Sequence, residues 1–166
     1  MAQPTDEDLA AVRHATEAAV AAVHAHDVDR LRAVLTDPGA VDRTLWYSYI
    51  VSDLLDLVRL AFDLHSGSGG QKIRQALPEP GDGFWLRSAM AGATGQELSV
   101  EEAERMSGVH AAAINTVRAL MTEYLRLEVN HGQAQQKRFL ELLDQASADP
   151  DRYVTIVMML ATAAAR

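Results

Sequence analysis

The sequence contains no cysteine. This absence excludes thiol catalysis, disulfide bonds and metal centres held by cysteine. Long apolar runs are also missing, because the longest uncharged run, residues 153–165, has about 13 residues whereas a membrane-spanning helix needs roughly 20. The opening residues MAQPTDEDLA are acidic and polar, unlike a secretory signal. We therefore expect a cytoplasmic protein that has no membrane partner.

Positive charge is scarce as well. Lysine and arginine number 15 against 23 aspartates and glutamates, which gives a formal net charge of −8. Basic residues are neighbours only in short groups, such as Arg30 with Arg32 and Lys137 with Arg138. Binding to nucleic acid depends on neutralising phosphates with clustered basic side chains. Nucleic acid is therefore not an expected partner.

The alternation of apolar and polar residues that marks a β-strand is absent over any useful length, and no segment repeats. Apolar residues follow a helical spacing through most of the chain instead. With 166 residues, 48% of them hydrophobic, the chain suits one domain with a substantial core. We predict a single all-α domain over residues 1–166, a bundle of about six or seven helices.

Glycine and proline gather in residues 66–83, which hold five glycines and two prolines. This segment is predicted to be a long flexible loop with room for one helical turn. Elsewhere, helix-start signals such as Thr5 followed by Asp8, and Asp149 followed by Pro150, set the boundaries. The expected helices span residues 5–26, 28–35, 43–65, 84–93, 99–130, 133–148 and 149–164.

Residues 98–121 allow two interpretations. Gly108, Ile114 and Val117 have the spacing of the second half of a helix-turn-helix motif, in which a glycine makes the turn and two apolar residues seat the reading helix. Such a motif over residues 99–118 would make the chain a DNA-associated or ligand-sensing transcriptional regulator. This interpretation is kept as an alternative.

The second interpretation of the same stretch is one long helix. The first half of a helix-turn-helix does not fit, because Glu104 and Ser107 stand where a small and a bulky apolar residue are needed. Apolar residues also continue in steps of three and four without a change of phase, and one glycine inside a helix costs only about 1 kcal/mol. We therefore predict one long central helix over about 99–130.

The six histidines suggest metal binding. The pair His26-Asp27 at a helix end is similar to the metal-holding pair of the HD-type phosphohydrolases, and that resemblance implies a metal-dependent hydrolase. His14 would supply the earlier ligand, and Asp53 or Asp56 the later one. The spacing from His14 to His26 is short for this family. We prefer exposed histidines at a frayed helix end and keep the hydrolase as an alternative.

Glu128-x-x-His131 has the spacing used in di-iron helical bundles. A di-iron site needs a second such pair, which the sequence lacks. His110 and His131 would lie roughly 30 Å apart on a straight helix, too far to share an ion. We therefore predict no metal at either histidine and no cofactor.

Aromatic residues make up only 5% of the chain. Trp46 and Tyr49 share one predicted helix, and Trp85 follows the glycine-rich segment. Pockets between bundle helices commonly bind ligands. We predict that these three residues, with His110 and Tyr124 as polar lining, form a pocket for a small apolar ligand.

The last predicted helix carries no charge over residues 154–165. A helix that is apolar on all sides must be covered on all sides, and a small domain with two such helices is expected to keep an apolar patch. We expect a second copy of the chain to cover this patch across a two-fold axis. The predicted dimer interface contains Val157, Leu160, Ala161 and Ala164. The function predicted is that of a non-catalytic interaction or regulatory protein, homodimeric, with a possible further protein partner.

Overall fold

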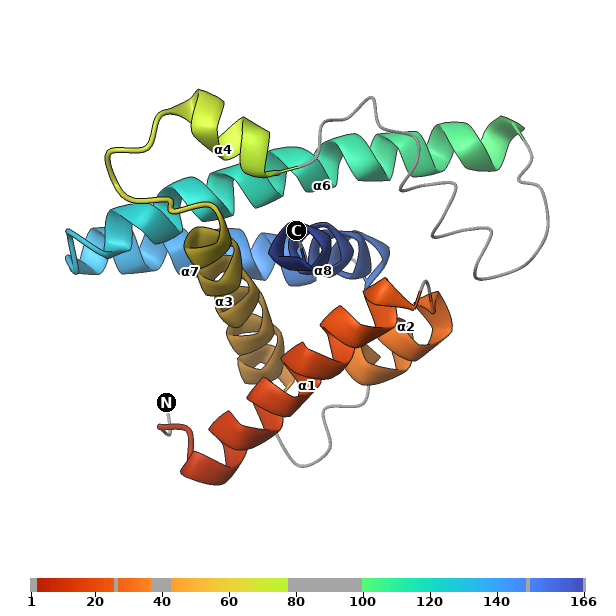
Figure 1. The fold of residues 1–166 in the computed structure, drawn as a ribbon, viewed down its shortest axis with the longest axis horizontal. Coiled ribbons are helices and arrows are strands. Elements are labelled where there is room, and N and C mark those ends of the chain that lie inside the picture. Colours follow the sequence, from red (N-terminus) through yellow and green to blue (C-terminus); the bar gives the residue numbers. More distant parts are fainter. Residues whose placement is uncertain (1–2, 26, 37–42, 78–99, 149, 166) are drawn as a thin grey trace.

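The structure, a computed structural model, describes residues 3–25, 27–36, 43–77, 100–148 and 150–165. Within these ranges the chain forms seven helices and no strand (Figure 1). The helices are α1 (Asp6–His24), α2 (Val28–Thr36), α3 (Arg43–Ala61), α4 (Gly70–Ala76), α6 (Val100–Leu127), α7 (Gln133–Ser147) and α8 (Pro150–Ala165). The predicted all-α bundle is confirmed for this part of the chain. No helix among the described residues is long and apolar enough to span a membrane.

Helix α8 occupies the centre of the bundle, where Figure 1 views it nearly end-on. It contacts α1, α2, α3, α6 and α7. Ile156, Val157 and Leu160 are fully buried, and the expectation that the last helix is mostly buried agrees with this. The long helix α6 lies along one side of the bundle (Figure 1) and contacts α3, α4, α7 and α8. The central position predicted for the long helix therefore belongs to α8.

Helix α6 continues without interruption through Gly108. A helix-turn-helix motif needs the chain to turn at this glycine, so that geometry is wrong for the described residues 100–118, whereas the regulatory function stays a prediction. The phase of the apolar residues explains the result, because Ala113, Val117 and Leu120 are all buried on one side of a single helix.

The start of α1 follows its sequence signal. The Thr5 hydroxyl accepts a hydrogen bond from the Asp8 amide at 3.1 Å, and the Asp8 carboxylate accepts one from the Thr5 amide at 2.8 Å. The bond from the Thr5 backbone lowers the pKa of Asp8. Two amides that a helix start leaves without partners are thereby satisfied by one residue pair.

The end of α3 comes earlier than predicted, at Ala61 instead of residue 65. Asp63 adopts a left-handed conformation with φ of 49°. The Leu64 amide then donates to the Arg59 carbonyl at 2.9 Å, and the Asp63 amide to the Leu60 carbonyl at 3.4 Å. This is a Schellman ending. The sequence did not indicate this helix end, because the left-handed residue is an aspartate and not a glycine.

The predicted loop over residues 66–83 is partly a helix. Residues 70–76 form α4, which buries Ile73 and Ala76 and contacts α6. Lys72 fixes it to the end of α3 by donating from Nζ to the Asp63 carbonyl at 2.7 Å. Residues 78–83 lie outside the described part of the chain, so the rest of the loop stays a prediction.

The predicted dimer interface on α8 is not on the surface. Val157, Leu160 and Ala161 are fully buried within one chain, and Ala164 is partly buried. Five helices of the same chain already cover the apolar surface that a second copy was expected to cover. Of the predicted interface residues, only Ala164 is therefore partly accessible to a second copy.

Candidate functional site

The structure does not bring the predicted pocket residues together. Trp46 and Tyr49 lie near the start of α3, whereas Tyr124 of α6 contacts Asp56, ten residues further along α3 than Trp46. Ten helical residues correspond to about 15 Å. Trp85 lies outside the described residues, as does the side chain of His110. The described members therefore line no common pocket.

The histidines do not gather with carboxylates either. His14, His24 and His131 are exposed, and His26 lies outside the described residues. Asp27 caps α2 by accepting a hydrogen bond from the Arg30 amide at 2.9 Å. Among the residues that the structure describes, no three side chains of metal-binding type form a group. The HD-like alternative therefore has no ligand set in this part of the chain.

The Asp53 and Glu128 candidates also have other roles. The Thr16 hydroxyl lies 3.4 Å from Asp53 Oδ2, and this contact joins α1 to α3. Burial raises the pKa of Asp53. Because α6 ends at Leu127, Glu128 and His131 stand beyond the helix and do not share a helical face. Glu128 faces Arg59 instead.

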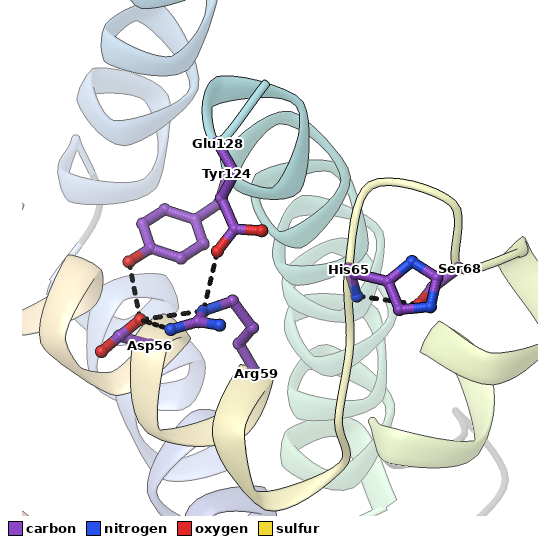
Figure 2. Close-up of polar contacts among 6 residues, drawn as sticks. All are labelled: Asp56, Arg59, His65, Ser68, Tyr124 and Glu128. Atoms are coloured by element: carbon purple, nitrogen blue, oxygen red, sulfur yellow. Dashed lines mark hydrogen bonds and ion pairs between the residues drawn. The ribbon is translucent and has the colours of Figure 1, made fainter. Parts of the chain in front are cut away.

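A network of four side chains joins the second half of α3 to the end of α6 (Figure 2). Asp56 Oδ1 accepts from Arg59 Nε at 2.9 Å and from Nη2 at 2.8 Å. It also accepts from the Tyr124 hydroxyl at 3.2 Å. Arg59 Nε lies 2.9 Å from Glu128 Oε1. The guanidinium of Arg59 thus lies between two carboxylates, Asp56 on α3 and Glu128 just beyond α6, and Asp56 also holds the Tyr124 phenol.

The protonation states of this network are strongly biased. Burial, followed by the charge of Asp56, raises the pKa of Tyr124 to about 12. The hydrogen bond to Asp56 raises the pKa of the Arg59 guanidinium. Tyr124 is therefore a stable hydrogen-bond donor near neutral pH, and Arg59 a permanent cation. Neither group can act as a general base or nucleophile there.

The loop that follows α3 is drawn beside the network in Figure 2. The His65 amide donates to the Ser68 hydroxyl at 2.9 Å, and the Gly67 amide donates to His65 Nδ1 at 3.1 Å. These bonds shape the loop locally. His65 is exposed and belongs to a separate set of contacts from the four-residue network.

Three large apolar residues that are next in sequence to network residues are exposed. Leu57 is 42% exposed, Leu60 61% and Val129 70%. Leu57 and Leu60 neighbour Asp56 and Arg59 in α3, and Val129 follows Glu128. We call the surface made by these residues the α3–α6 corner; it comprises Asp56, Leu57, Arg59, Leu60, Tyr124, Glu128 and Val129.

Sequence reasoning missed the α3–α6 corner. The Asp56–Tyr124 pair joins residues 68 positions apart, and nothing in the local pattern marks them as partners. The available signal was Asp56 with Arg59, three residues apart on one helix, where opposite charges support each other. That signal predicts a pair within α3 but not its partners on α6.

Comparison with known proteins adds no relative to this picture. The sequence matches no protein-family model, and no curated protein or solved structure matches it. A functional conclusion must therefore come from the residues and their geometry.

Proposed function

We propose that this chain is a non-catalytic protein that acts by binding another protein chain through the α3–α6 corner, and that this partner is a second copy of itself. The observation that carries the proposal is that three exposed large apolar residues, Leu57, Leu60 and Val129, are sequence neighbours of residues in the ordered network of Asp56, Arg59, Tyr124 and Glu128. Single exposed leucines are ordinary on protein surfaces. A group of them around ordered Arg and Tyr side chains has the composition of an interface centre.

The polar network supports binding because it orders the surface in advance. Arg59 is held by Asp56 and Glu128, and Tyr124 is held by Asp56 and packs against Phe139 with ring centroids 5.9 Å apart. Association normally costs about 0.5–1.5 kcal/mol for each flexible side chain that becomes fixed. Side chains that are already fixed avoid much of that cost.

The arrangement of charges at the corner allows a second copy to bind, although the corner itself carries a formal charge of −1. The chain carries a net charge of −8, so most pairs of its surfaces repel each other. The corner holds a cation, Arg59, between two carboxylates, Asp56 and Glu128. A two-fold interface brings the same patch of both copies together. Arg59 of each copy can then face a carboxylate of the other.

The experiment is light scattering of the whole chain at micromolar concentration. We expect twice the mass of one chain, and we expect Leu60→Glu to give a monomer because it places two like charges in the contact. Leu9→Glu is the control, since Leu9 is also an exposed leucine, 40% against 61% for Leu60, but lies on α1. A monomeric unmodified protein, or a Leu60→Glu protein that stays dimeric, would disprove the proposal.

A further inference from the structure

A second polar cluster joins α6 to α7, on residues that the α3–α6 corner does not use. Glu123 of α6 is only 4% exposed. Its Oε1 atom lies 2.8 Å from Arg126 Nη1 and 3.4 Å from Arg138 Nε. The side chains of the two arginines are 51% and 65% exposed. One buried carboxylate oxygen therefore holds two exposed guanidiniums side by side.

The other carboxylate oxygen of Glu123, Oε2, lowers the stability of the folded state. Oε2 is buried and accepts no hydrogen bond from the residues that the structure describes. A buried polar atom without a partner destabilises the folded state, and a well-packed apolar side chain in the same place is often neutral or favourable. Stability alone therefore gives no reason for a carboxylate at this position. Its visible effect is to position Arg126 and Arg138.

The two guanidiniums keep most of their donors. Each arginine has five N–H donors, and the described contacts occupy only one nitrogen of each, Nη1 of Arg126 and Nε of Arg138. The three side chains together carry a formal charge of +1. Planar guanidiniums match the oxygens of phosphate with paired hydrogen bonds, and they do so better when held in place.

We propose that Arg126 and Arg138, positioned by Glu123, form a binding site for a phosphate group. The proposal is independent of the α3–α6 corner, because it uses none of its residues. The neighbouring Lys137 is not part of the site, since its ammonium lies 3.9 Å from Glu141 and it makes no described contact with Glu123. Lys137 therefore offers a control of equal charge one residue away.

The test is calorimetric titration of the whole chain with inorganic phosphate, with total ionic strength held constant by sodium chloride. We expect saturable binding that Arg138→Gln weakens by about tenfold, the effect of losing a charge-assisted hydrogen bond. Lys137→Gln should change the affinity less than twofold. Equal losses in both variants, or the absence of saturable binding, would overturn the proposal.

The variant Glu123→Gln distinguishes two effects of Glu123: positioning of the two arginines, and its charge acting on the bound phosphate. The substitution removes a negative charge beside the site, so attraction alone predicts tighter phosphate binding. Positioning predicts weaker binding, because the amide holds the guanidiniums less firmly. We expect weakening, and tighter binding would contradict the assignment. If Glu123→Gln loses its helical circular dichroism, Arg126→Gln replaces it, with the same tenfold loss expected and an unchanged affinity contradicting the proposal.

Two further ligands identify the source of the phosphate group. Phenyl phosphate represents a phosphate ester, and acetate represents a carboxylate. Phenyl phosphate binding at least as tightly as inorganic phosphate would assign the site to an esterified ligand, and weaker binding to the free ion. Both results support the proposal. Acetate binding as tightly as phosphate would contradict it, because the site would then have no preference for a phosphate group over another small anion.

Discussion

The two polar clusters on α6 begin at adjacent residues and yet differ in kind. Tyr124 points to α3, where Asp56 and Arg59 give it a half-buried network with reciprocal partners. One Glu123 oxygen is shared by Arg126 of α6 and Arg138 of α7, and its other oxygen has no described partner. The first arrangement stabilises a contact between helices. The second leaves one buried carboxylate oxygen without a described partner, a cost in stability that the proposed phosphate site would explain.

Removing the acceptor of the first cluster tests its structural role. Asp56→Leu deletes the oxygen that accepts from Arg59 and Tyr124, and it leaves their donors without that partner. We expect the free energy of unfolding to fall by about 2 kcal/mol, the lower range for charged hydrogen bonds because Asp56 is partly exposed. Urea unfolding measures it. Asp144→Leu, on an exposed part of α7, is the control and should change little; equal effects would show that Asp56 has no special role.

The same kind of substitution in the second cluster should have the opposite sign. Glu123→Met replaces a buried, incompletely bonded carboxylate with an apolar side chain of similar shape. Because Arg126 and Arg138 are exposed enough to be hydrated, we expect the free energy of unfolding to rise by about 1 kcal/mol. Urea unfolding of both variants in one buffer makes the comparison direct. A fall in the free energy of unfolding would mean that both clusters stabilise the fold. The Glu123 carboxylate would then carry no cost in stability that needs a functional explanation.

High pH should weaken the first cluster, which contains Tyr124, and should leave the Glu123 cluster unchanged. The pKa of Tyr124 is about 12 in the folded chain and about 10 in an unfolded one. The folded state therefore favours the protonated phenol, so the stabilisation is complete below pH 10 and is lost as the pH rises toward 12. Tyr124 is half-buried, and we expect a loss of about 1 kcal/mol.

The measurement for this prediction is the pH dependence of urea unfolding between about pH 9 and 11. Tyr153 also has a raised pKa through burial and will contribute to the same slope. Tyr124→Phe isolates the part due to Tyr124, because Tyr153 stays unchanged in that variant. The slope should be smaller in Tyr124→Phe than in the unmodified chain. Identical slopes would show that the Asp56–Tyr124 bond does not hold the proton on Tyr124.

The parts of the fold that could be predicted have causes that are local in sequence. The uncharged run in α8 required burial, and the unbroken phase in α6 required one helix. The Thr5–Asp8 box marked the start of α1. Each of these depends on residues within a few turns of each other, where spacing determines geometry.

The parts that could not be predicted depend on distant residues or on rare backbone conformations. Asp56 meets Tyr124 only because α3 and α6 cross at that point, and Glu123 meets Arg138 only through the packing of α7. The end of α3 depends on a left-handed aspartate, Asp63. The residues Val157, Leu160 and Ala161, predicted to face a second copy, are buried within one chain, because a local pattern shows that a helix must be covered but not which chain covers it.

The long helix α6 contains one glycine, Gly108, at which its continuity can be tested. It lies inside the helix on the exposed side, and a Cβ atom added there meets no atom within 4 Å. Gly108→Ala should therefore raise the free energy of unfolding by about 0.5–1 kcal/mol, because alanine loses less backbone entropy in a helix and has no steric conflict here. A turn at this glycine with positive φ would reverse the sign, since alanine is strained in that conformation.

Thermal unfolding followed by circular dichroism distinguishes the two outcomes. Ala111→Gly, on the same exposed side of α6, is the control that makes the reverse substitution. A loss of stability in both Gly108→Ala and Ala111→Gly would contradict the prediction. It would mean that α6 bends at residue 108, so that the residues before Gly108 do not continue the helix that carries Glu123 and Tyr124.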